Sequence, residues 1–350
     1  MRGIQGRSIA GGEAPRRHHY AIGLATVVGL VLLLGVLSAA SAAPRGSGAQ
    51  AATKPLFGLV PPVQHPAFAE AAAVVGPTCK QLGCKAVFVQ PPKCDAQLQS
   101  SIIRDLITRG VAGIAVGACD PVSVGKTLAQ IRKQKGPKFP IVTFDADCCK
   151  SVRTIQIGTP NFLLGKLQAQ EINRLLPSGG RILNITGNLA MTNVQDRIRG
   201  MKATLRSNIK MDIAPAVGSS PDLIPSLIRD ALTKNPDIKV INEQAGAGAV
   251  VAQSLDQQGK DIPVVANNAF KEILDWMRKG RIVYATVEHQ GFMAELATRA
   301  MYHLYKGQKP TTDFFGVDVV GVRKSTINTY KAAQKREDVK LRRKFEAIWR

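Results

Sequence analysis

The sequence predicts an α/β protein with two doubly wound parallel-sheet lobes, because short apolar segments alternate with amphipathic ones along most of the chain. One apolar segment, residues 141–144, is rich in β-branched residues and is followed by the carboxylates of Asp145 and Asp147. This pattern is typical of a buried parallel strand, whose carboxyl end opens into a cleft where α/β sheets bind ligands. The roughly 300 residues that follow an apolar N-terminal segment favour two lobes over a single core.

In the first half of the chain, predicted strands alternate with predicted helices. The strands are short apolar runs at residues 56–60, 85–90, 111–116 and 140–144. The helices between them are amphipathic and cover residues 67–82, 95–108 and 121–135. This alternation predicts a parallel sheet with right-handed crossovers and helices on both faces.

The same alternation continues in the second half and predicts a second lobe of the same kind. The predicted helices cover residues 161–176, 191–207, 221–233, 245–258, 269–278 and 291–305. The predicted strands cover residues 181–186, 211–217, 239–242, 262–266, 282–287 and 314–320. No helix begins with a glycine-rich nucleotide-binding or phosphate-binding motif, so we expect no cofactor.

The N-terminal segment is typical of a secretory signal peptide covering residues 1–42. Several arginines precede an apolar run at residues 21–37, and Ala40-Ser41-Ala42 offers a small-residue cleavage site. The alternative is an uncleaved anchor helix, since the apolar run is just long enough to span a bilayer. A flexible leader, residues 43–53, follows. We therefore expect an exported protein, located in the periplasm or elsewhere outside the cytoplasm.

The chain carries a formal net charge of +22, which suggests an anionic partner or surface. Nucleic acid is disfavoured, because aromatic residues make up only 5% of the chain and no nucleic-acid-binding motif is present. Residues 331–350 form a basic, helix-prone tail with eight Lys and Arg against three acidic residues. We expect a solvated terminal helix there; the alternative is a tail that binds a membrane or a partner.

The sequence contains six cysteines, all in its first half, and an even number in an exported chain indicates disulfides. Two of them flank Gly83 at a predicted helix-to-strand turn and are candidates for a local pair. The others follow predicted strands and gather at one end of the sheet, where the pairing stays open. A metal site is disfavoured because the usual ligand spacings are missing. The disulfide candidates are Cys79, Cys84, Cys94, Cys119, Cys148 and Cys149.

The chain from about residue 54 to 322 resembles the type I periplasmic sugar-binding proteins, the ribose-binding-like solute receptors of ABC importers. The resemblance rests on the order and spacing of several short motifs. They are Thr143-Phe144-Asp145, Gly158-Thr159-Pro160-Asn161 with Gly165, Arg197-x-x-Gly200, and Gly280-Arg281-Ile282. It implies two lobes joined by three hinge crossovers. The N-terminal lobe would comprise residues 54–159 and 289–318, the C-terminal lobe residues 160–288 and 319–330.

The resemblance also implies a ligand site made of polar side chains and one aromatic ring. Planar polar side chains donate to and accept from sugar hydroxyl groups. An aromatic ring packs against the C–H face of a sugar ring. This sequence departs from the family pattern at Ala67, Gln244, Asn268 and Glu288, so the ligand identity stays open. The candidate ligand-binding residues are Gln64, His65, Phe68, Asp145, Asp147, Arg197, Gln244, Asn268 and Glu288.

The resemblance implies a monomeric, non-catalytic receptor that captures a sugar or polyol and delivers it to the membrane permease of an ABC importer. The alternative is a ligand-sensing subunit for a chemoreceptor or sensor kinase. An enzyme using Asp145, Asp147, Glu288 and His65 as acids and bases is disfavoured, because no motif fixes a nucleophile. A sugar-responsive repressor is disfavoured by the export signal and by the lack of an N-terminal helix-turn-helix.

Overall fold

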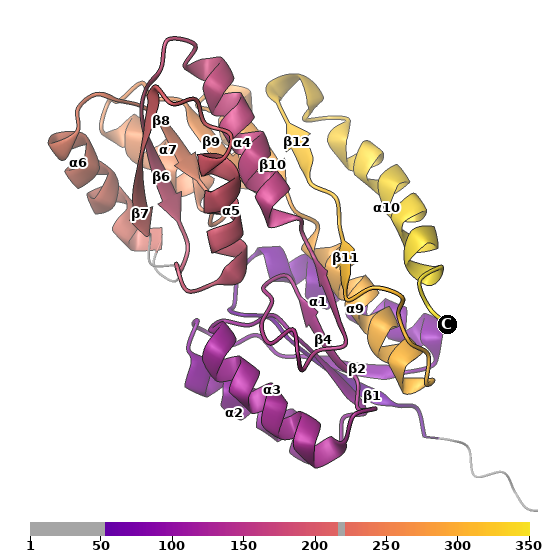
Figure 1. The fold of residues 1–350 in the computed structure, drawn as a ribbon. Helices are drawn as coiled ribbons and strands as arrows, with labels where there is room; N and C mark the ends of the chain where they lie inside the picture. The colour runs from indigo at the N-terminus through magenta and orange to yellow at the C-terminus, as the bar shows by residue number, and fades with distance from the viewer. Residues whose placement is uncertain (1–52, 216–220) are drawn as a thin grey trace, which may run out of the picture. The chain divides into compact units, whose positions relative to one another are not determined.

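The computed structural model describes residues 53–215 and 221–350, which form two α/β lobes (Figure 1). The predicted signal peptide and nearly all of the predicted leader lie outside the described residues. Within the described ranges, no helix combines the length and apolar character needed to cross a membrane. The prediction of two parallel-sheet lobes is confirmed.

The first sheet has six strands in the order β11-β5-β4-β3-β1-β2, and all of its pairings are parallel. Its central strands are buried, which explains their continuous apolar sequences. The strands are β1 (Leu56–Val60), β2 (Lys85–Phe88), β3 (Gly113–Val116), β4 (Ile141–Phe144), β5 (Ile155–Gly158) and β11 (Phe314–Gly316).

The second sheet has the order β12-β10-β9-β8-β6-β7, and β12 pairs antiparallel with β10 at its edge. The strands are β6 (Gly180–Thr186), β7 (Ile209–Pro215), β8 (Ile238–Glu243), β9 (Val264–Asn267), β10 (Ile282–Val287) and β12 (Val320–Val322). The chain passes from one sheet to the other three times, after β5, after β10 and between β11 and β12. The single strand predicted at residues 314–320 is therefore two strands, one in each sheet.

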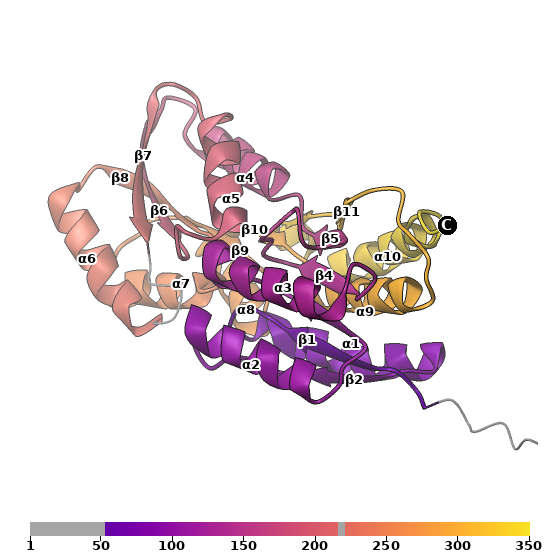
Figure 2. The same cartoon turned by 60° about the horizontal axis from the view of Figure 1, so that its bottom comes forward.

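Helices cover both faces of each sheet. On the first sheet, α1 and α9 pack together on one face, and Figure 2 shows α2 and α3 side by side on the other. These helices are α1 (Ala67–Leu82), α2 (Ala96–Thr108), α3 (Pro121–Lys135) and α9 (Gln290–Tyr305). On the second sheet, α4 and α5 cover one face and α6, α7 and α8 the other. They are α4 (Asn161–Leu175), α5 (Thr192–Lys202), α6 (Ile224–Lys234), α7 (Gly248–Gln257) and α8 (Lys271–Lys279).

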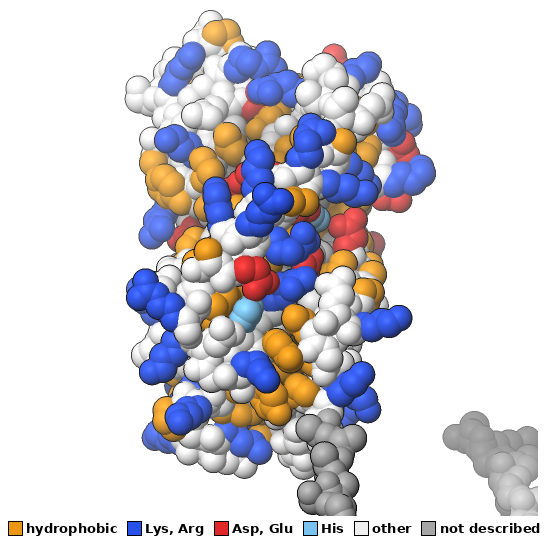
Figure 3. All heavy atoms as spheres, turned by 90° about the vertical axis from the view of Figure 1, so that its right-hand side faces the viewer, with side chains coloured by type: hydrophobic (Ala, Val, Ile, Leu, Met, Phe, Trp, Pro, Cys, Tyr) orange, Lys and Arg blue, Asp and Glu red, His pale blue; other side chains and the backbone are white. Residues whose placement is uncertain are grey.

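The C-terminal segment differs from the solvated helix that we expected. It forms helix α10 (Tyr330–Glu346), whose apolar side chains Leu341 and Phe345 are buried in the first lobe together with Trp349. Trp349 also forms an isolated β-bridge with Pro310. The outer face of this region remains basic, and Figure 3 shows Lys and Arg side chains spread over it. Apolar residues spaced along a highly charged helix give too weak a pattern to be recognised in the sequence.

We expect Phe345→Ala to lower the free energy of unfolding by about 3–5 kcal/mol, because it leaves a cavity in the core. Phe345 is fully buried, and its ring packs edge-on against Phe315 and Trp349 at centroid distances of 5.2 and 5.6 Å. Urea unfolding measures the change. The control is Val339→Ala on the exposed side of the same helix, which should change the free energy by less than about 0.5 kcal/mol. Equal effects of the two substitutions would contradict the packing of α10.

Two disulfides are present among the described residues. Cys79–Cys84 links the end of α1 to the start of β2, as the sequence suggested for a local pair. Cys94–Cys119 joins two segments that follow β2 and β3, at the carboxyl edge of the sheet. Cys148 and Cys149 are free thiols. The expectation that all six cysteines form disulfides is thus met for four of them.

Candidate ligand-binding site

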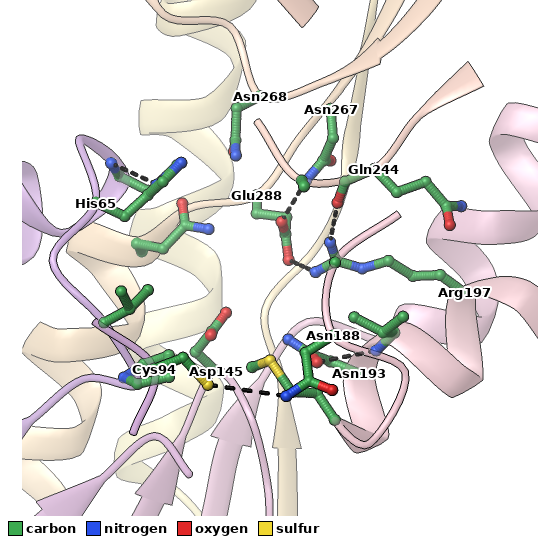
Figure 4. A pocket seen from close by; sticks show the side chains of 18 of the residues that line it. His65, Cys94, Asp145, Asn188, Asn193, Arg197, Gln244, Asn267, Asn268 and Glu288 are labelled. Carbon is green, nitrogen blue, oxygen red and sulfur yellow. Dashed lines mark hydrogen bonds and ion pairs between the residues drawn. The ribbon is translucent and has the colours of Figure 1, made fainter. Parts of the chain in front are cut away.

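A cavity of about 480 Å³ lies between the carboxyl ends of the strands of the two lobes (Figure 4). Both lobes contribute to its lining, as expected where parallel strands end at the same edge of a sheet. Of the nine predicted site residues, seven line the cavity: His65, Phe68, Asp145, Arg197, Gln244, Asn268 and Glu288.

Asp145 is the main polar group that the first lobe contributes. It directly follows β4, its backbone is left-handed with φ 61°, and its side chain is almost fully buried. Among the described residues, no hydrogen-bond donor reaches its carboxylate. Burial raises the pKa of Asp145 to about 7; the negative charge of Glu288 adds to the effect and Arg197 opposes it. This carboxylate faces the cavity with its acceptor oxygens unused.

Arg197 on α5 is the centre of a buried network in the second lobe. Its Nε donates to Asn161 Oδ1 at 2.7 Å and its Nη1 to the carbonyl of Gln244 at 2.9 Å. Its Nη2 donates to Glu288 Oε1, and Asn267 Nδ2 holds the other oxygen of that carboxylate at 2.8 Å. Figure 4 shows these groups converging at the wall of the cavity. The network fixes the guanidinium plane and the Glu288 carboxylate before any ligand arrives.

Close packing of α4 on α5 positions Arg197. Gly165 of α4 lies against the backbone of Arg197, and Gly200 of α5 lies against the carbonyl of Phe162, so that a Cβ at either glycine would collide with backbone atoms. The two glycines therefore allow the helices to approach at the point where Arg197 leaves α5. This explains the spacing of Arg197 and Gly200 in the sequence.

We expect Gly200→Ala to lower the free energy of unfolding by about 1–3 kcal/mol, because the added methyl group forces α4 and α5 apart. The control is Gly76→Ala in α1, where an added Cβ meets nothing within 4 Å. That substitution should stabilise by about 0.5–1 kcal/mol through helix propensity alone. Chemical unfolding of both variants measures these changes. An unchanged free energy of unfolding in Gly200→Ala would contradict the close packing of α4 on α5.

His65 and Phe68 lie on the opposite wall. His65 Nδ1 accepts from the amide of Ala67 at 3.2 Å, and burial lowers the pKa of His65, which favours the neutral ring. Phe68 is 4% exposed and packs edge-on against Phe144, so it serves the core and the cavity wall at once.

Gln244 has a different role from the one predicted. Its side-chain amide donates to Gln168 Oε1 at 2.7 Å and points away from the cavity, as Figure 4 shows. Its backbone carbonyl accepts a hydrogen bond from Arg197 Nη1. Gln244 therefore supports the arginine, whereas Asn268 presents a side chain with no hydrogen-bond partner among the described residues.

Gln64 and Asp147, which we expected at the site, lie outside the cavity. Gln64, one residue before His65, is exposed in the loop after β1. Asp147 accepts hydrogen bonds from Thr143 Oγ1 at 2.6 Å and from Arg153 Nε at 2.8 Å. Its carboxylate is thus engaged within the first lobe, two residues beyond the one that faces the cavity.

Several residues that complete the site were not among the predicted ones. Asn267 and Gln290 line the cavity, and Asn161 holds Arg197. Glu243, at the end of β8, is fully buried, and burial raises its pKa to about 7, while hydrogen bonds from nearby backbone amides oppose this shift. Asn267 and Glu243 each precede a predicted site residue at the end of a strand. A search for polar residues at strand ends could have identified Asn267 and Glu243 from the sequence.

The site combines polar and apolar surfaces. It presents carboxylate, amide and guanidinium groups beside an apolar wall, which suits a ligand with several hydroxyl groups. Within residues 53–215 and 221–350, no group of three or more His, Cys, Asp or Glu side chains could hold a metal ion.

Two parallel-sheet lobes with a polar cavity between their strand ends define the type I periplasmic binding protein fold. The chain belongs to this family: the model described as "Periplasmic binding protein domain" matches residues 57–309. The ribose import binding protein RbsB of Escherichia coli (strain K12) is 22% identical over 169 residues, which cover 47% of this chain and 55% of RbsB. The chain thus aligns with only about half the length of this curated relative.

Solved structures show the same fold over more of the chain. An ABC transporter solute-binding protein from Burkholderia graminis, in complex with D-arabinose, has a TM-score of 0.72 and 27% identity. That match covers 80% of this chain and 98% of the other. GanP, a glucose-galactose binding protein from Geobacillus stearothermophilus, has a TM-score of 0.73 and 20% identity and covers 79% and 99% of the two chains.

Proposed function

We propose that this protein is an exported receptor that captures a sugar or polyol in the cavity between its lobes. The observation that carries the proposal is the pairing of a free acceptor, the Asp145 carboxylate, with the fixed Arg197–Glu288 pair across the cavity. A ring or chain of hydroxyl groups can donate to the carboxylates and accept from the guanidinium at the same time. The solved relatives named as binding arabinose, glucose and galactose support the same ligand class.

We further propose that the ligand-bound protein, a monomer, docks on the membrane permease of an ABC importer and performs no chemistry itself. Its membership of a substrate-binding family supports this role. Closure of the lobes would signal occupancy, since a ligand that contacts both lobes stabilises the closed state. The basic, apolar N-terminus of the chain supports export through a signal peptide at residues 1–42. A sensor subunit for a chemoreceptor or kinase would use the same ligand site.

A thermal-shift screen of the purified protein against pentoses, hexoses, polyols, amino sugars and amino acids tests the ligand class. A sugar at about 100 times its dissociation constant should stabilise the fold by about 2.7 kcal/mol. The stabilisation should be lost in Asp145→Asn and kept in Gln64→Ala, whose side chain lies outside the cavity. A response to amino acids alone would overturn the sugar assignment while leaving the receptor role in place.

A further inference from the structure

Cys148 and Cys149 form a cluster that the ligand site does not use. They follow Asp147 in the loop after β4, and their Sγ atoms are 2.7 Å apart. The two sulfur atoms are thus in direct contact without being bonded, since a covalent S–S bond is about 2.05 Å long. Cys148 is buried in the core beside α2 and α3, whereas Cys149 is half-buried and reachable from solvent.

The backbone and its surroundings hold the two thiols in this arrangement. Three non-glycine residues in the described part of the chain have positive φ: Asp145 and Asn268, which line the cavity, and Cys149, with φ 43°. Such a conformation is costly for a side chain and tends to persist where function requires it. Gly125 of α3 makes room, since a Cβ there would come within 3.2 Å of Cys149 Cβ.

We propose that Cys148 and Cys149 are a redox-active pair that closes into a vicinal disulfide, a third disulfide located in the loop that carries Asp145. The proposal is independent of the ligand. It also accounts for the even number of cysteines in a chain whose other four are already paired.

The oxidant is a disulfide, either glutathione disulfide or the disulfide of a thiol–disulfide oxidase. The more accessible Cys149, as its thiolate, attacks one sulfur of the donor, and the other half of the donor leaves as a thiol after taking up a proton. Cys148, after losing its own proton, then attacks Cys149 Sγ and displaces the second half of the donor. The two protein thiols lose two electrons and two protons, and the donor disulfide becomes two thiols.

The new disulfide should be the most easily reduced of the three. Adjacent Cα atoms across a trans peptide lie about 3.8 Å apart, below the range of about 4.4–6.8 Å in ordinary disulfides. The Cα separations of Cys79–Cys84 and Cys94–Cys119, 4.6 and 5.4 Å, lie within it. A ring closed across neighbouring residues is strained, and strained disulfides are the more readily reduced ones.

Peptide mapping of the full exported chain tests the proposal. Trypsin releases residues 139–150, which contain Cys148 and Cys149 and no other cysteine. After incubation with glutathione disulfide, denaturation and treatment with iodoacetamide, this peptide should be lighter than its reduced form by two hydrogen atoms and carry no alkyl group. Graded dithiothreitol should open it before the other two disulfides. In Cys148→Ser and Cys149→Ser, the remaining thiol should become alkylated or carry glutathione.

Three results would overturn the proposal. The first is full alkylation of both thiols in the wild-type peptide after oxidation. The second is a peptide joined to Cys94, Cys119 or another chain instead of closed on itself. The third, which overturns the lability, is opening at the same dithiothreitol concentration as Cys94–Cys119. All three are read from the wild-type protein, so they hold even if a serine variant fails to fold.

Discussion

Arg197→Met is expected to abolish ligand-induced stabilisation and to lower the free energy of unfolding by about 3–5 kcal/mol. The substitution leaves Glu288 buried without its cation, near the buried Asp145; Glu243 at the end of β8 is buried as well. Removing one partner of a buried ion pair is costly, because the remaining charge keeps its desolvation penalty without the attraction that offset it. Urea unfolding and the thermal-shift screen measure the two effects.

Arg199→Met is the matched control. Arg199 lies two residues further along the same helix, its side chain is 67% exposed, and it pairs with the exposed Asp196. We expect a change below about 1 kcal/mol and unaltered ligand binding. Equal losses in the two variants would show that the helix, rather than the buried ion pair, is sensitive to substitution.

A second substitution separates charge from packing. If the uncompensated carboxylate causes the loss, adding Glu288→Gln to Arg197→Met should restore part of the stability, because the orphaned charge is gone. Ligand binding should stay lost, since both side chains that we propose to contact the ligand are altered. A double variant that is less stable than either single variant would refute this explanation.

The fold was predictable because the signals that specify it are local and repeated. Short apolar strands alternate with amphipathic helices over most of the described chain, and this pattern favours parallel sheets. The errors fall where the elements are shortest. The strand β5 (Ile155–Gly158) was missed, and the segment around Val317 was predicted as one strand although it crosses between the sheets. The β5 sequence is Ile-Gln-Ile-Gly, so it lacks the continuous apolar run by which other four-residue strands, such as β4, were recognised.

The candidate site was predictable only as a set of positions. Polar residues at strand ends pointed to the correct edge of each sheet, as Asp145 and Glu288 show. The sequence did not reveal which polar groups are free. The Asp147 carboxylate accepts a hydrogen bond from Arg153, and the Gln244 side-chain amide donates one to Gln168. Neither contact was predicted from the sequence. Whether a polar side chain serves the ligand or the protein depends on pairing in three dimensions.

Asp145→Asn is expected to affect stability and binding in opposite directions. Burial raises the pKa of Asp145 to about 7, so at pH 8 the folded protein contains an ionised carboxylate whose burial destabilises the fold. Asparagine has nearly the same shape, tolerates positive φ and carries no charge. The variant should therefore be more stable than the wild type at pH 8, by roughly 1–3 kcal/mol. Ligand binding should nevertheless be lost, because the amide supplies only one acceptor oxygen.

The sign of the pH dependence follows from proton linkage. Between about pH 4 and pH 7 the folded protein keeps the Asp145 proton and the unfolded chain has released it, so this group's contribution to stability falls as the pH rises. Glu243, whose pKa is also raised, contributes to the pH dependence of stability in the same direction in the wild type and in Asp145→Asn, so its effect cancels when the two are compared. The stability advantage of Asp145→Asn should thus be near zero at pH 4 and fully developed above pH 7. Denaturant unfolding at several pH values measures it.

Asp230→Asn, at an exposed position of α6, is the control and should show no such pH-dependent gain. If Asp145→Asn instead destabilises the protein at pH 8, the carboxylate has a partner in the unliganded state and is not held ready for a ligand. A gain in stability together with lost binding has a direct physical reason. A binding protein keeps a desolvated acceptor without a donor because the donor is the ligand, and the cost in the free state is recovered when hydroxyl groups bind.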